Sequence, residues 1–497
     1  MKNTVYGLFQ KTVKSNTDNI AIIENNRKIT FGDLSEMVDM IADSFPKGIK
    51  SVGIVMRHRA EIIASIFAVL KTGAMYIPAE PSFPEGRIRY MMDEAKVDFI
   101  LTEKQLAVKL KGYKQIYSDN YIRTKTPKNS TKVYKQKPED PAYVLYTSGT
   151  TGRPKGISVT NQNICHYVRA FENEFHPGSE DIMLQYSVCS FDIFVEEVFA
   201  SLLNGAALAI PSDDDKKDIQ SLMNFVERHG VTILSGFPYL LAEMNRLSDI
   251  PESLRLLISG GDVLRGYHVN HLLEKAEIYN TYGPSETTVC VSYYRCRDGQ
   301  VLSDGTYPIG HPVPGAEIRI MDADGNEVKR GEIGELCISG SGVSNGYVGN
   351  HEEENKAFKE LSDGNRMYRS GDLGYILPDG NIAFLRRKDT QIMIYGKRVE
   401  VTEVESKLHQ CDGIEQAVVR PFTDEEGLSY MIAYIVPGRP DLKLSQLRKE
   451  LSENLTEFMI PEFIVKMPRI PLNSNGKPDM TQMPVVMKEG KVYECID

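Results

Sequence analysis

Residues 206–238 read "AALAIPSDDDKKDIQSLMNFVERHGVTILSGFP", and this stretch decides the fold class. The runs 206–211 and 231–238 are short and aliphatic, which is typical of buried strands. Between them, residues 218–230 carry apolar side chains at helical spacing. A strand, a helix and a second strand in this order predict an α/β unit with parallel strands.

The same alternation continues on both sides of this stretch. Helices are expected over 29–45, 60–73, 162–175 and 194–205, and strands over 51–56, 97–102, 143–146, 181–187 and 254–261. Strands and helices that alternate over this length predict a core with largely parallel sheets.

After about residue 300 the pattern changes to short antiparallel strands. Residues 316–328 contain an Asp-Gly turn, and 368–400 predict further hairpins. From about residue 390 the order is strand, helix, strand, strand, helix, which predicts a small α+β domain. The charged "RRKD" at 386–389 is the expected hinge, and the polar, lysine-rich segment 120–140 is expected to be a solvated connector.

Composition excludes several classes of protein. A chain of 497 residues is too long for one core, and its net charge of −10 argues against a nucleic-acid binder. There is no apolar run long enough to cross a membrane and no signal peptide, so we expect a cytoplasmic protein. The seven cysteines form no CxxC pair and the nine histidines are dispersed. We therefore expect free thiols, no structural zinc site and no transition-metal chemistry.

The segment "YTSGTTGRPKG" at 146–156 has the composition of a phosphate-binding loop. It offers hydroxyl donors and one lysine, and its glycines permit positive φ angles and a close approach of the backbone to an anion. The spacing of a P-loop is absent. The residues expected to contact phosphate are Thr147, Ser148, Gly149, Thr150, Thr151 and Lys155.

Six motifs occur in the order and spacing of the adenylate-forming superfamily, and the chain resembles most closely the adenylation domains of nonribosomal peptide synthetases. The motifs are "YTSGTTGRPKG", "NTYGPSETT", "GELCISGSGVSNGY", "YRSGDLG", "LRRKDTQIMIYGKRVE" and "NSNGKPD". Two further segments, "LKTGAMYIPAEPSFPEGRIRYM" and "CSFDIFVEEVF", resemble the branch that activates amino acids.

The resemblance implies a reaction in two halves. A carboxylate attacks the α-phosphate of ATP to give an acyl-adenylate and pyrophosphate, and the phosphopantetheine thiol of a carrier protein then takes the acyl group. The implied fold is a large core over residues 1–388, with two mostly parallel helix-flanked sheets and a small β-barrel-like subdomain. A small mobile α+β lid over 389–497 carries the catalytic lysine.

The resemblance also implies an ATP site with Mg²⁺. Tyr282 would stack on adenine, Asp372 would accept the ribose hydroxyls, and Glu286 would bind the metal. Lys477 and Arg387 are the expected catalytic cations, and Asp389 is the expected hinge. Besides the phosphate loop, the nucleotide-binding set implied by the resemblance is Gly261, Asn280, Thr281, Tyr282, Asp372 and Arg387.

For the substrate, the resemblance implies that Asp192 pairs with an α-ammonium group. The implied side-chain pocket is Ile193, Glu196, Tyr239, Ile258, Gly260, Thr281, Val289 and Cys290. Glu196 favours a second cation, as in ornithine or lysine, unless it faces solvent beside Glu197. Val289 and Cys290 resemble the end of pockets that take aromatic amino acids, and a bulky Tyr239 would shorten the cavity. The sequence leaves these alternatives open.

The second half-reaction is expected to use "YGKRVE", where Gly396 would line the pantetheine tunnel. Tyr395 and Pro478 depart from the usual pattern. The chain carries no carrier domain, so we expect a separate carrier protein as partner, whether the chain is natively alone or excised. The alternatives are a D-alanine–carrier-protein ligase, an acyl- or aryl-CoA synthetase, and a non-catalytic nucleotide-binding homologue.

Overall fold

A computed structural model describes residues 4–118, 136–149, 153–362, 364–388, 391–424, 427–471 and 482–484. The chain forms two compact units. Unit 1 consists of residues 1–81, 92–145 and 156–388, and unit 2 consists of 82–91, 146–155 and 389–497. Two segments from the first third of the sequence thus belong to unit 2, which the sequence did not predict. The roles expected for the two domains stay predictions.

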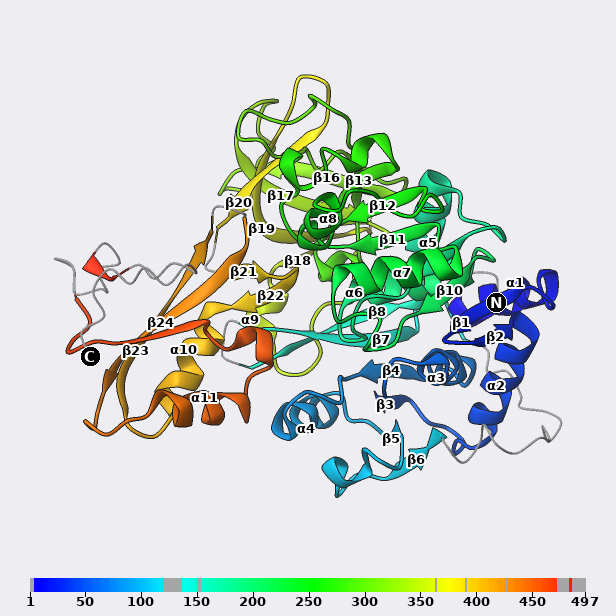
Figure 1. The fold of residues 1–497 in the computed structure, drawn as a ribbon, viewed down its shortest axis with the longest axis horizontal. Helices are drawn as coiled ribbons and strands as arrows, with labels where there is room; N and C mark the ends of the chain where they lie inside the picture. Colours follow the sequence, from blue (N-terminus) through cyan, green and yellow to red (C-terminus); the bar gives the residue numbers. More distant parts are fainter. Residues whose placement is uncertain are drawn as a thin grey trace. The chain divides into compact units, whose positions relative to one another are not determined.

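Unit 1 contains a nine-stranded sheet in the order β15-β14-β13-β12-β11-β9-β10-β1-β2 (Figure 1). Its strands are β1 Ile20–Glu24, β2 Arg27–Thr30, β9 Ile182–Leu184, β10 Ala207–Ile210, β11 Ile233–Gly236, β12 Leu256–Ser259, β13 Glu277–Tyr282, β14 Ser292–Arg295 and β15 His311–Pro312. The pairs from β1 through β10, β9, β11 and β12 to β13 are parallel, and the two edges are antiparallel. The predicted parallel α/β core is confirmed.

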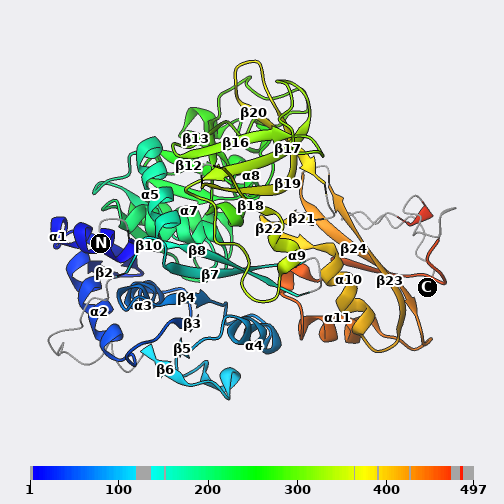
Figure 2. The ribbon, with the colours of Figure 1, turned by 180° about the vertical axis from the view of Figure 1, so that it is seen from behind.

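A second sheet has six strands in the order β6-β5-β3-β4-β7-β8. Its strands are β3 Ser51–Val55, β4 Met75–Pro78, β5 Phe99–Thr102, β6 Gln115–Tyr117, β7 Pro141–Thr147 and β8 Lys155–Thr160. Strands β3, β4 and β5 pair in parallel, and Figure 2 shows them with helix α3 alongside. Helix α3, Ala60–Lys71, is buried on nearly all sides, which explains why its sequence is apolar all round.

Three of the other helices of the first 355 residues follow predicted spans closely, one follows its span in part, and four were not predicted. Together they are α1 Val5–Ser15, α2 Phe31–Asp43, α4 Glu85–Glu94, α5 Asn161–Phe175, α6 Asp192–Val195, α7 Ile219–His229, α8 Pro238–Asn245 and α9 Glu352–Asn355. Thr30 and Thr160 cap α2 and α5 through capping boxes, which fixes where these helices begin. The single helix expected over 194–205 is wrong in detail, because α6 is short and a π-helical turn, Glu196–Ala200, follows it.

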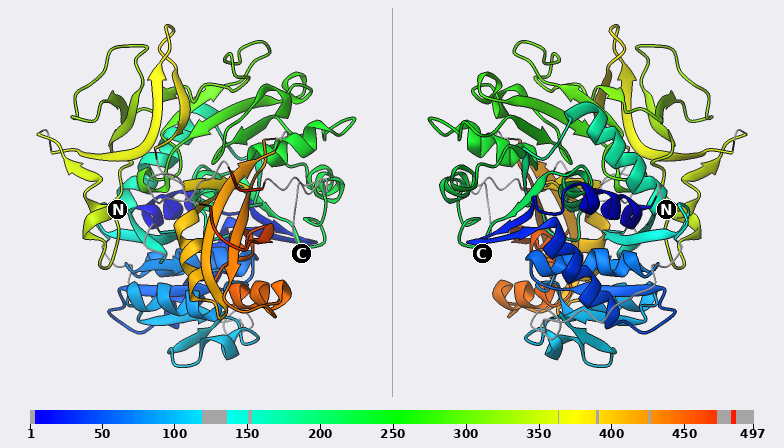
Figure 3. Two further views of the ribbon diagram at one scale, coloured as in Figure 1. Left: turned by 90° about the vertical axis from the view of Figure 1, so that its left-hand side faces the viewer. Right: turned by 90° about the vertical axis from the view of Figure 1, so that its right-hand side faces the viewer.

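A five-stranded antiparallel sheet completes unit 1. Its strands are β16 Ala316–Met321, β17 Gly334–Gly340, β18 Phe358–Glu360, β19 Arg366–Ile376 and β20 Ile382–Arg387. In Figure 3 these yellow-green to yellow strands form a curved ribbon. This curled half-barrel corresponds to the predicted barrel-like subdomain, and its hairpins confirm the antiparallel reading of the sequence after residue 300.

Unit 2 contains the predicted small α+β fold. Its elements are β21 Gln391–Ile394, β22 Lys397–Glu400, α10 Val401–Gln410, β23 Ile414–Thr423, β24 Ser429–Pro437, α11 Leu444–Ser452 and β25 Phe463–Lys466. Tyr395 and Gly396 join β21 to β22 with φ angles of 48° and 70°. Two successive positive φ angles define a type I′ hairpin turn, which glycine favours and tyrosine rarely adopts. Strands β21 and β22 lie in the segment 368–400 where hairpins were predicted, whereas β25 was not predicted.

The connector expected over 120–140 lies mostly outside the described residues. Across the described ranges, no helix has both the length and the apolar character needed to cross a membrane.

Candidate active site

The candidate site residues of unit 1 follow the carboxyl ends of parallel strands. Gly260 comes directly after β12, Tyr282 is the last residue of β13, and α6 begins at Asp192 in the segment after β9. In open α/β sheets, ligands bind outside the carboxyl ends of the strands. The fold thus gathers side chains that are distant in sequence at the edge where a ligand would bind.

Asp192 is the first residue of α6 and keeps partial exposure to solvent. Its Oδ2 accepts a hydrogen bond of 2.6 Å from the hydroxyl of Ser285. The pKa of Asp192 is raised to about 6, chiefly by loss of solvent around the carboxylate and also by the nearby charge of Glu286. A cation close to a desolvated carboxylate stabilises its ionised form and lowers its pKa.

Glu196 lies one helical turn later and is only 2% exposed, so the interpretation in which it faces solvent is wrong. The hydroxyl of Tyr167 donates a hydrogen bond to its Oε2, the nearby hydroxyl of Ser235 lowers its pKa, and its Oε1 has no hydrogen-bond partner among the described residues. Burial raises the pKa of Glu196 to about 7. A buried acid with an unused oxygen is costly unless a ligand supplies the missing donor.

Three other predicted pocket residues lie around Glu196. A Cβ atom added to Gly260 would come within 2.8 Å of Thr281 Oγ1 and 4.0 Å of Cys290 Sγ. The Cys290 thiol is close to Glu196 and Thr281, and burial raises its pKa well above the usual value, so it stays protonated. The structure therefore brings together Glu196, Gly260, Thr281 and Cys290.

The backbone before Cys290 is strained. Thr288 and Val289 have φ angles of 65° and 67°, a left-handed conformation that β-branched residues rarely adopt. The Thr288 hydroxyl donates a 2.7 Å hydrogen bond to the carbonyl of Gly342, which helps to hold this turn. Strain of this kind concentrates where a structure positions functional groups.

The remaining predicted pocket residues differ in burial. Ile193, Ile258 and Val289 are 8%, 1% and 2% exposed, whereas Tyr239 is 39% exposed at the start of α8. Tyr239 therefore lies in a more open position than a side chain that shortens a buried cavity. The membership of these residues in a substrate pocket stays a prediction.

The predicted nucleotide residues form one network on β13, β19 and β20. Asp372 and Arg387 are directly opposite each other in the β19–β20 pair. Asp372 Oδ1 accepts a 2.7 Å bond from Arg387 Nη1, and its Oδ2 accepts a 2.6 Å bond from the Tyr282 hydroxyl. The carboxylate of Asp372 therefore connects the three side chains that are predicted to bind the adenosine part.

Glu286 is fully buried in a 3₁₀ turn, Ser285–Thr287. Its Oε1 accepts a 2.5 Å bond from the hydroxyl of Tyr347. Hard carboxylate oxygens are the ligands that Mg²⁺ prefers, so the residue fits the predicted metal role chemically. The other two predicted residues nearby have visible local roles: Asn280 Nδ2 donates to the carbonyl of Pro308 at 2.8 Å, and Gly261 has a φ angle of 78°.

The start of the phosphate loop belongs to unit 2. Ser148 accepts from the amide of Glu400 and donates to the carbonyl of Arg398, and the Gly149 amide donates to Glu403 Oε2 at 3.2 Å. Thr147 Oγ1 is buried with no partner within the described part of the chain. A buried hydroxyl without a partner is consistent with a loop that binds a hydrogen-bond acceptor such as phosphate.

The described glycines of this loop do not have the positive φ angles that were expected. Gly149 and Gly156 lack positive φ angles, and Gly156 lies within β8. A Cβ at Gly149 would lie 1.8 Å from the carbonyl oxygen of Arg153, so the reason for glycine there is close approach of the backbone. Lys155 begins β8 and is 4% exposed. The predictions for Gly152, Thr150, Thr151, Asp389 and Lys477 lie outside the described residues.

Several residues of the site were not predicted from the sequence. They are Tyr167, Ser235, Ser285 and Tyr347, whose hydroxyls partner the carboxylates. Ser285 and Tyr347 lie inside two of the six motifs, which could have indicated them, whereas Tyr167 and Ser235 carry no such signal and only the fold brings them to the acids.

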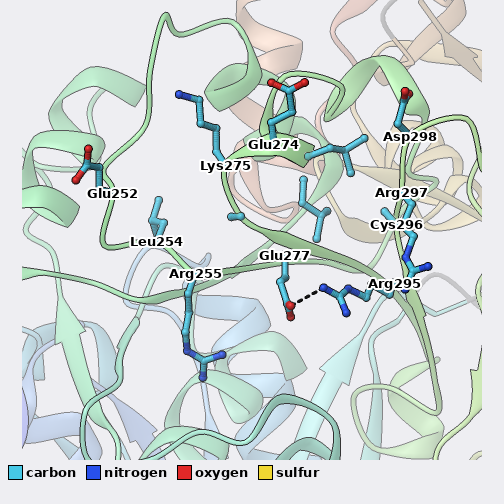
Figure 4. Close-up of a pocket in the computed structure, with 13 residues that line it drawn as sticks. Glu252, Leu254, Arg255, Glu274, Lys275, Glu277, Arg295, Cys296, Arg297 and Asp298 are labelled. Atoms are coloured by element: carbon cyan, nitrogen blue, oxygen red, sulfur yellow. Dashed lines mark hydrogen bonds and ion pairs between the residues drawn. The ribbon is translucent and has the colours of Figure 1, made fainter.

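A hollow of 580 Å³ lies at the other end of β12 and β13, around their first residues (Figure 4). Arg255 directly precedes β12 and Glu277 is the first residue of β13. Glu277 forms an ion pair with Arg295 of β14. Its lining is dominated by charged side chains that reach solvent. It is therefore separate from the candidate site at the carboxyl ends.

Comparison with known proteins agrees with this fold. A family model described as "AMP-binding enzyme" matches residues 9–348, and "AMP-binding enzyme C-terminal domain" matches 403–477. Bacitracin synthase 2 of Bacillus licheniformis is 35% identical over 97% of the chain, and gramicidin S synthase 1 of Brevibacillus brevis is 33% identical over 97%. The chain spans only 18% and 44% of the lengths of these two relatives.

Among solved structures, an artificially fused adenylation–PCP di-domain NRPS from Klebsiella oxytoca has a TM-score of 0.85 at 24% identity, with 93% of each chain covered. A Vibrio cholerae adenylation domain in complex with glycyl-adenosine-5′-phosphate has a TM-score of 0.84 at 22% identity, covering 94% of this chain and 95% of that one. At these identities the likeness concerns the fold.

Proposed function

This chain belongs to the family of AMP-binding enzymes, and we propose that it converts an amino acid to its adenylate with ATP and passes it to the phosphopantetheine thiol of a separate carrier protein. The observation that carries this proposal is the arrangement of Asp192 and Glu286. Ser285 bonds Asp192, and the next residue, Glu286, is itself a buried carboxylate whose charge raises the pKa of Asp192. Two acids this close favour bound cations, and an amino acid with magnesium supplies two.

The amino acid, the adenosine part of ATP and Mg²⁺ each have a complementary group in this site. The α-ammonium of the substrate would pair with Asp192, which would hold the substrate carboxylate in position to attack the α-phosphate of ATP. Tyr282, Asp372 and Arg387 would bind the adenosine part. Mg²⁺, when bound by Glu286, would neutralise phosphate charge.

The catalytic cations stay assigned by motif. Lys477 would neutralise the charge that develops on the α-phosphate, and Lys155 with the hydroxyls of the phosphate loop would bind the leaving pyrophosphate. The unpartnered hydroxyl of Thr147 and the close backbone approach at Gly149 support the phosphate-binding role of the loop.

We also propose that the substrate side chain ends in a cationic group, as in a diamino acid. Glu196 is buried among hydroxyls, a thiol and apolar groups, and its Oε1 has no partner within the described ranges. A side-chain ammonium would supply the missing donor and would favour the ionised acid. An aromatic or aliphatic side chain would leave this oxygen unsatisfied, at a cost of about 1–3 kcal/mol.

The relatives support an adenylating role. Two peptide synthetases of bacilli share about a third of their matched residues with this chain, and the Vibrio cholerae structure contains a glycyl adenylate. Asp192 argues against the function of an acyl- or aryl-CoA synthetase, because a substrate without an ammonium group would leave this carboxylate without a cation. Against D-alanine stands Glu196, which so small a side chain would not reach.

The test is amino-acid-dependent ATP–pyrophosphate exchange with the full chain, over a panel with lysine, ornithine, D-alanine, tyrosine and phenylalanine. We expect exchange with a diamino acid and its loss in Asp192→Ala. Glu277→Gln is the control, because Glu277 is the first residue of β13, at the opposite end of the strand from the candidate site. Exchange that survives in Asp192→Ala would exclude the ammonium role, and a preference for phenylalanine would exclude the cationic side chain.

A further inference from the structure

A second cluster of unlike polar side chains lies in unit 1. His58 follows β3, Glu80 follows β4, and Cys189 lies three residues before Asp192. Because β3 and β4 are parallel neighbours, the residues after them reach the same edge of the six-stranded sheet. Cys189 reaches this edge from the segment that follows β9 of the other sheet.

The three side chains converge closely. His58 Nε2 lies 3.0 Å from Glu80 Oε1 and 3.1 Å from Oε2. One nitrogen of His58, one oxygen of Glu80 and the sulfur of Cys189 all lie within 4.8 Å of one another. The His58 and Glu80 side chains are 16% and 9% exposed, and Cys189 is 1% exposed.

The surroundings of the cluster are poor in alternative partners. The His58 ring meets the ring of Phe194 edge-on, with centroids 5.8 Å apart. Its Nδ1 is buried with no hydrogen-bond partner in the described part of the chain. The amide of Cys189 donates to Glu80 Oε1 at 2.6 Å, which fixes the cysteine backbone against the carboxylate. The polar interactions of the imidazole are therefore confined to this cluster.

Imidazole nitrogen, carboxylate oxygen and thiolate sulfur are the three ligand types of protein zinc sites. Zn²⁺ bound to a neutral imidazole, a carboxylate and a thiolate would make a cluster without net charge, which suits a buried position.

We propose that His58, Glu80 and Cys189 form a binding site for a thiophilic divalent cation, with Zn²⁺ as the best chemical match, although the dispersed cysteines and histidines of the sequence predicted no zinc site. The site is distinct from the magnesium role of Glu286 and does not depend on the proposed substrate. Three protein ligands leave one tetrahedral position for water. The cation would link the edge of the six-stranded sheet to the segment that carries Asp192, and so would stabilise the amino-acid side of the candidate active site.

The experiment uses the purified full chain after treatment with a chelator, titrated with Co²⁺. Co²⁺ occupies sites that Zn²⁺ prefers and, unlike Zn²⁺, is coloured; a thiolate ligand adds a strong near-ultraviolet charge-transfer band. We expect this band to saturate at one equivalent and to disappear when Zn²⁺ is added. No thiolate band at stoichiometric Co²⁺ would overturn the proposal.

Matched variants identify the thiolate. Cys189→Ala should abolish the band, whereas Cys165→Ala, at an equally buried cysteine of α5, should retain it. The reverse pattern would refute the assignment. Glu80→Gln and His58→Ala provide a second readout that does not require the cysteine variant to fold, since each should weaken Zn²⁺ binding at least tenfold in competition with a chromophoric chelator. Unchanged affinity in both variants would also overturn the proposal.

Discussion

Glu196 and Glu197 are consecutive, both are buried in the same π-helical turn, and their surroundings differ. Glu197 accepts from the side chain of Gln185 at 3.0 Å and from the backbone amides of Tyr186 and Ser187 at 3.1 and 3.0 Å. The charge of Lys216 also lowers its pKa. Glu196 accepts a hydrogen bond from the hydroxyl of Tyr167, and its other oxygen has no partner in the described ranges.

The comparison teaches how to separate structural acids from functional ones. Burial raises the pKa of both residues to about 7, so the pKa alone does not distinguish them. The partners do, because Glu197 is satisfied by the fold and Glu196 is not. An acid left incomplete beside Asp192 indicates a place for a ligand.

The largest expected effect is the loss of stability in Glu197→Ala. Removing this carboxylate leaves the side-chain amide of Gln185 and two backbone amides without their acceptor and takes away the negative charge near Lys216, which should cost about 3–5 kcal/mol of unfolding free energy. Urea unfolding of the variant measures this value, with Glu196→Ala as the matched control, which should lose about 1 kcal/mol. Equal losses in the two variants would remove the distinction between the acids.

The next effect concerns catalysis. Asp192→Ala should lower amino-acid-dependent exchange by roughly 100-fold or more, because a charged hydrogen bond to the substrate is lost. Its melting temperature should stay close to that of the wild type, since its one described side-chain partner is the hydroxyl of Ser285. A large drop in melting temperature would instead class Asp192 with Glu197 as a structural acid.

Glu196→Gln should change specificity. The variant keeps the size of the side chain and loses its charge, so KM for a diamino acid should rise roughly 10- to 100-fold. KM for a neutral amino acid of similar length should fall or stay constant. Steady-state exchange kinetics with lysine and its neutral isosteres measure both values, and a parallel rise in the two KM values would show that charge is not recognised.

The smallest effect is on pH-dependent stability. The folded-state pKa of Glu196 is about 7, above the usual 4.5, so its contribution to stability is present at low pH and is lost as pH rises through about 7. Glu196→Gln should therefore be more stable than the wild type at pH 8 by on the order of 1–2 kcal/mol. Melting curves between pH 5 and 8 should show this difference vanish toward pH 5, and a difference that is constant with pH would contradict the raised pKa.

The fold was largely predictable because its elements leave local signals. Aliphatic runs such as 206–211 and helical periodicity such as 218–230 survive in the structure as β10 and α7. The errors lie where local signals are weak: the π-helical turn was read as a regular helix, and helices α1, α4 and α8 and the short strand β25 were missed. The three-residue strand β9 shows that length is the least secure part of such a prediction.

The sequence by itself determined the fold class, the family and the types of groups available, because periodicity and ordered motifs are local properties of the chain. Only the tertiary structure decided the partners of each group. Nothing in "EE" at 196–197 tells which acid meets hydroxyls and which meets amides and a lysine. Likewise, positions 58, 80 and 189 have no shared spacing, and they converge because two parallel strands end at one edge and a loop from another sheet meets them there. Burial and partners arise from long-range packing, so the identity of a functional carboxylate or metal ligand is fixed only in the folded chain.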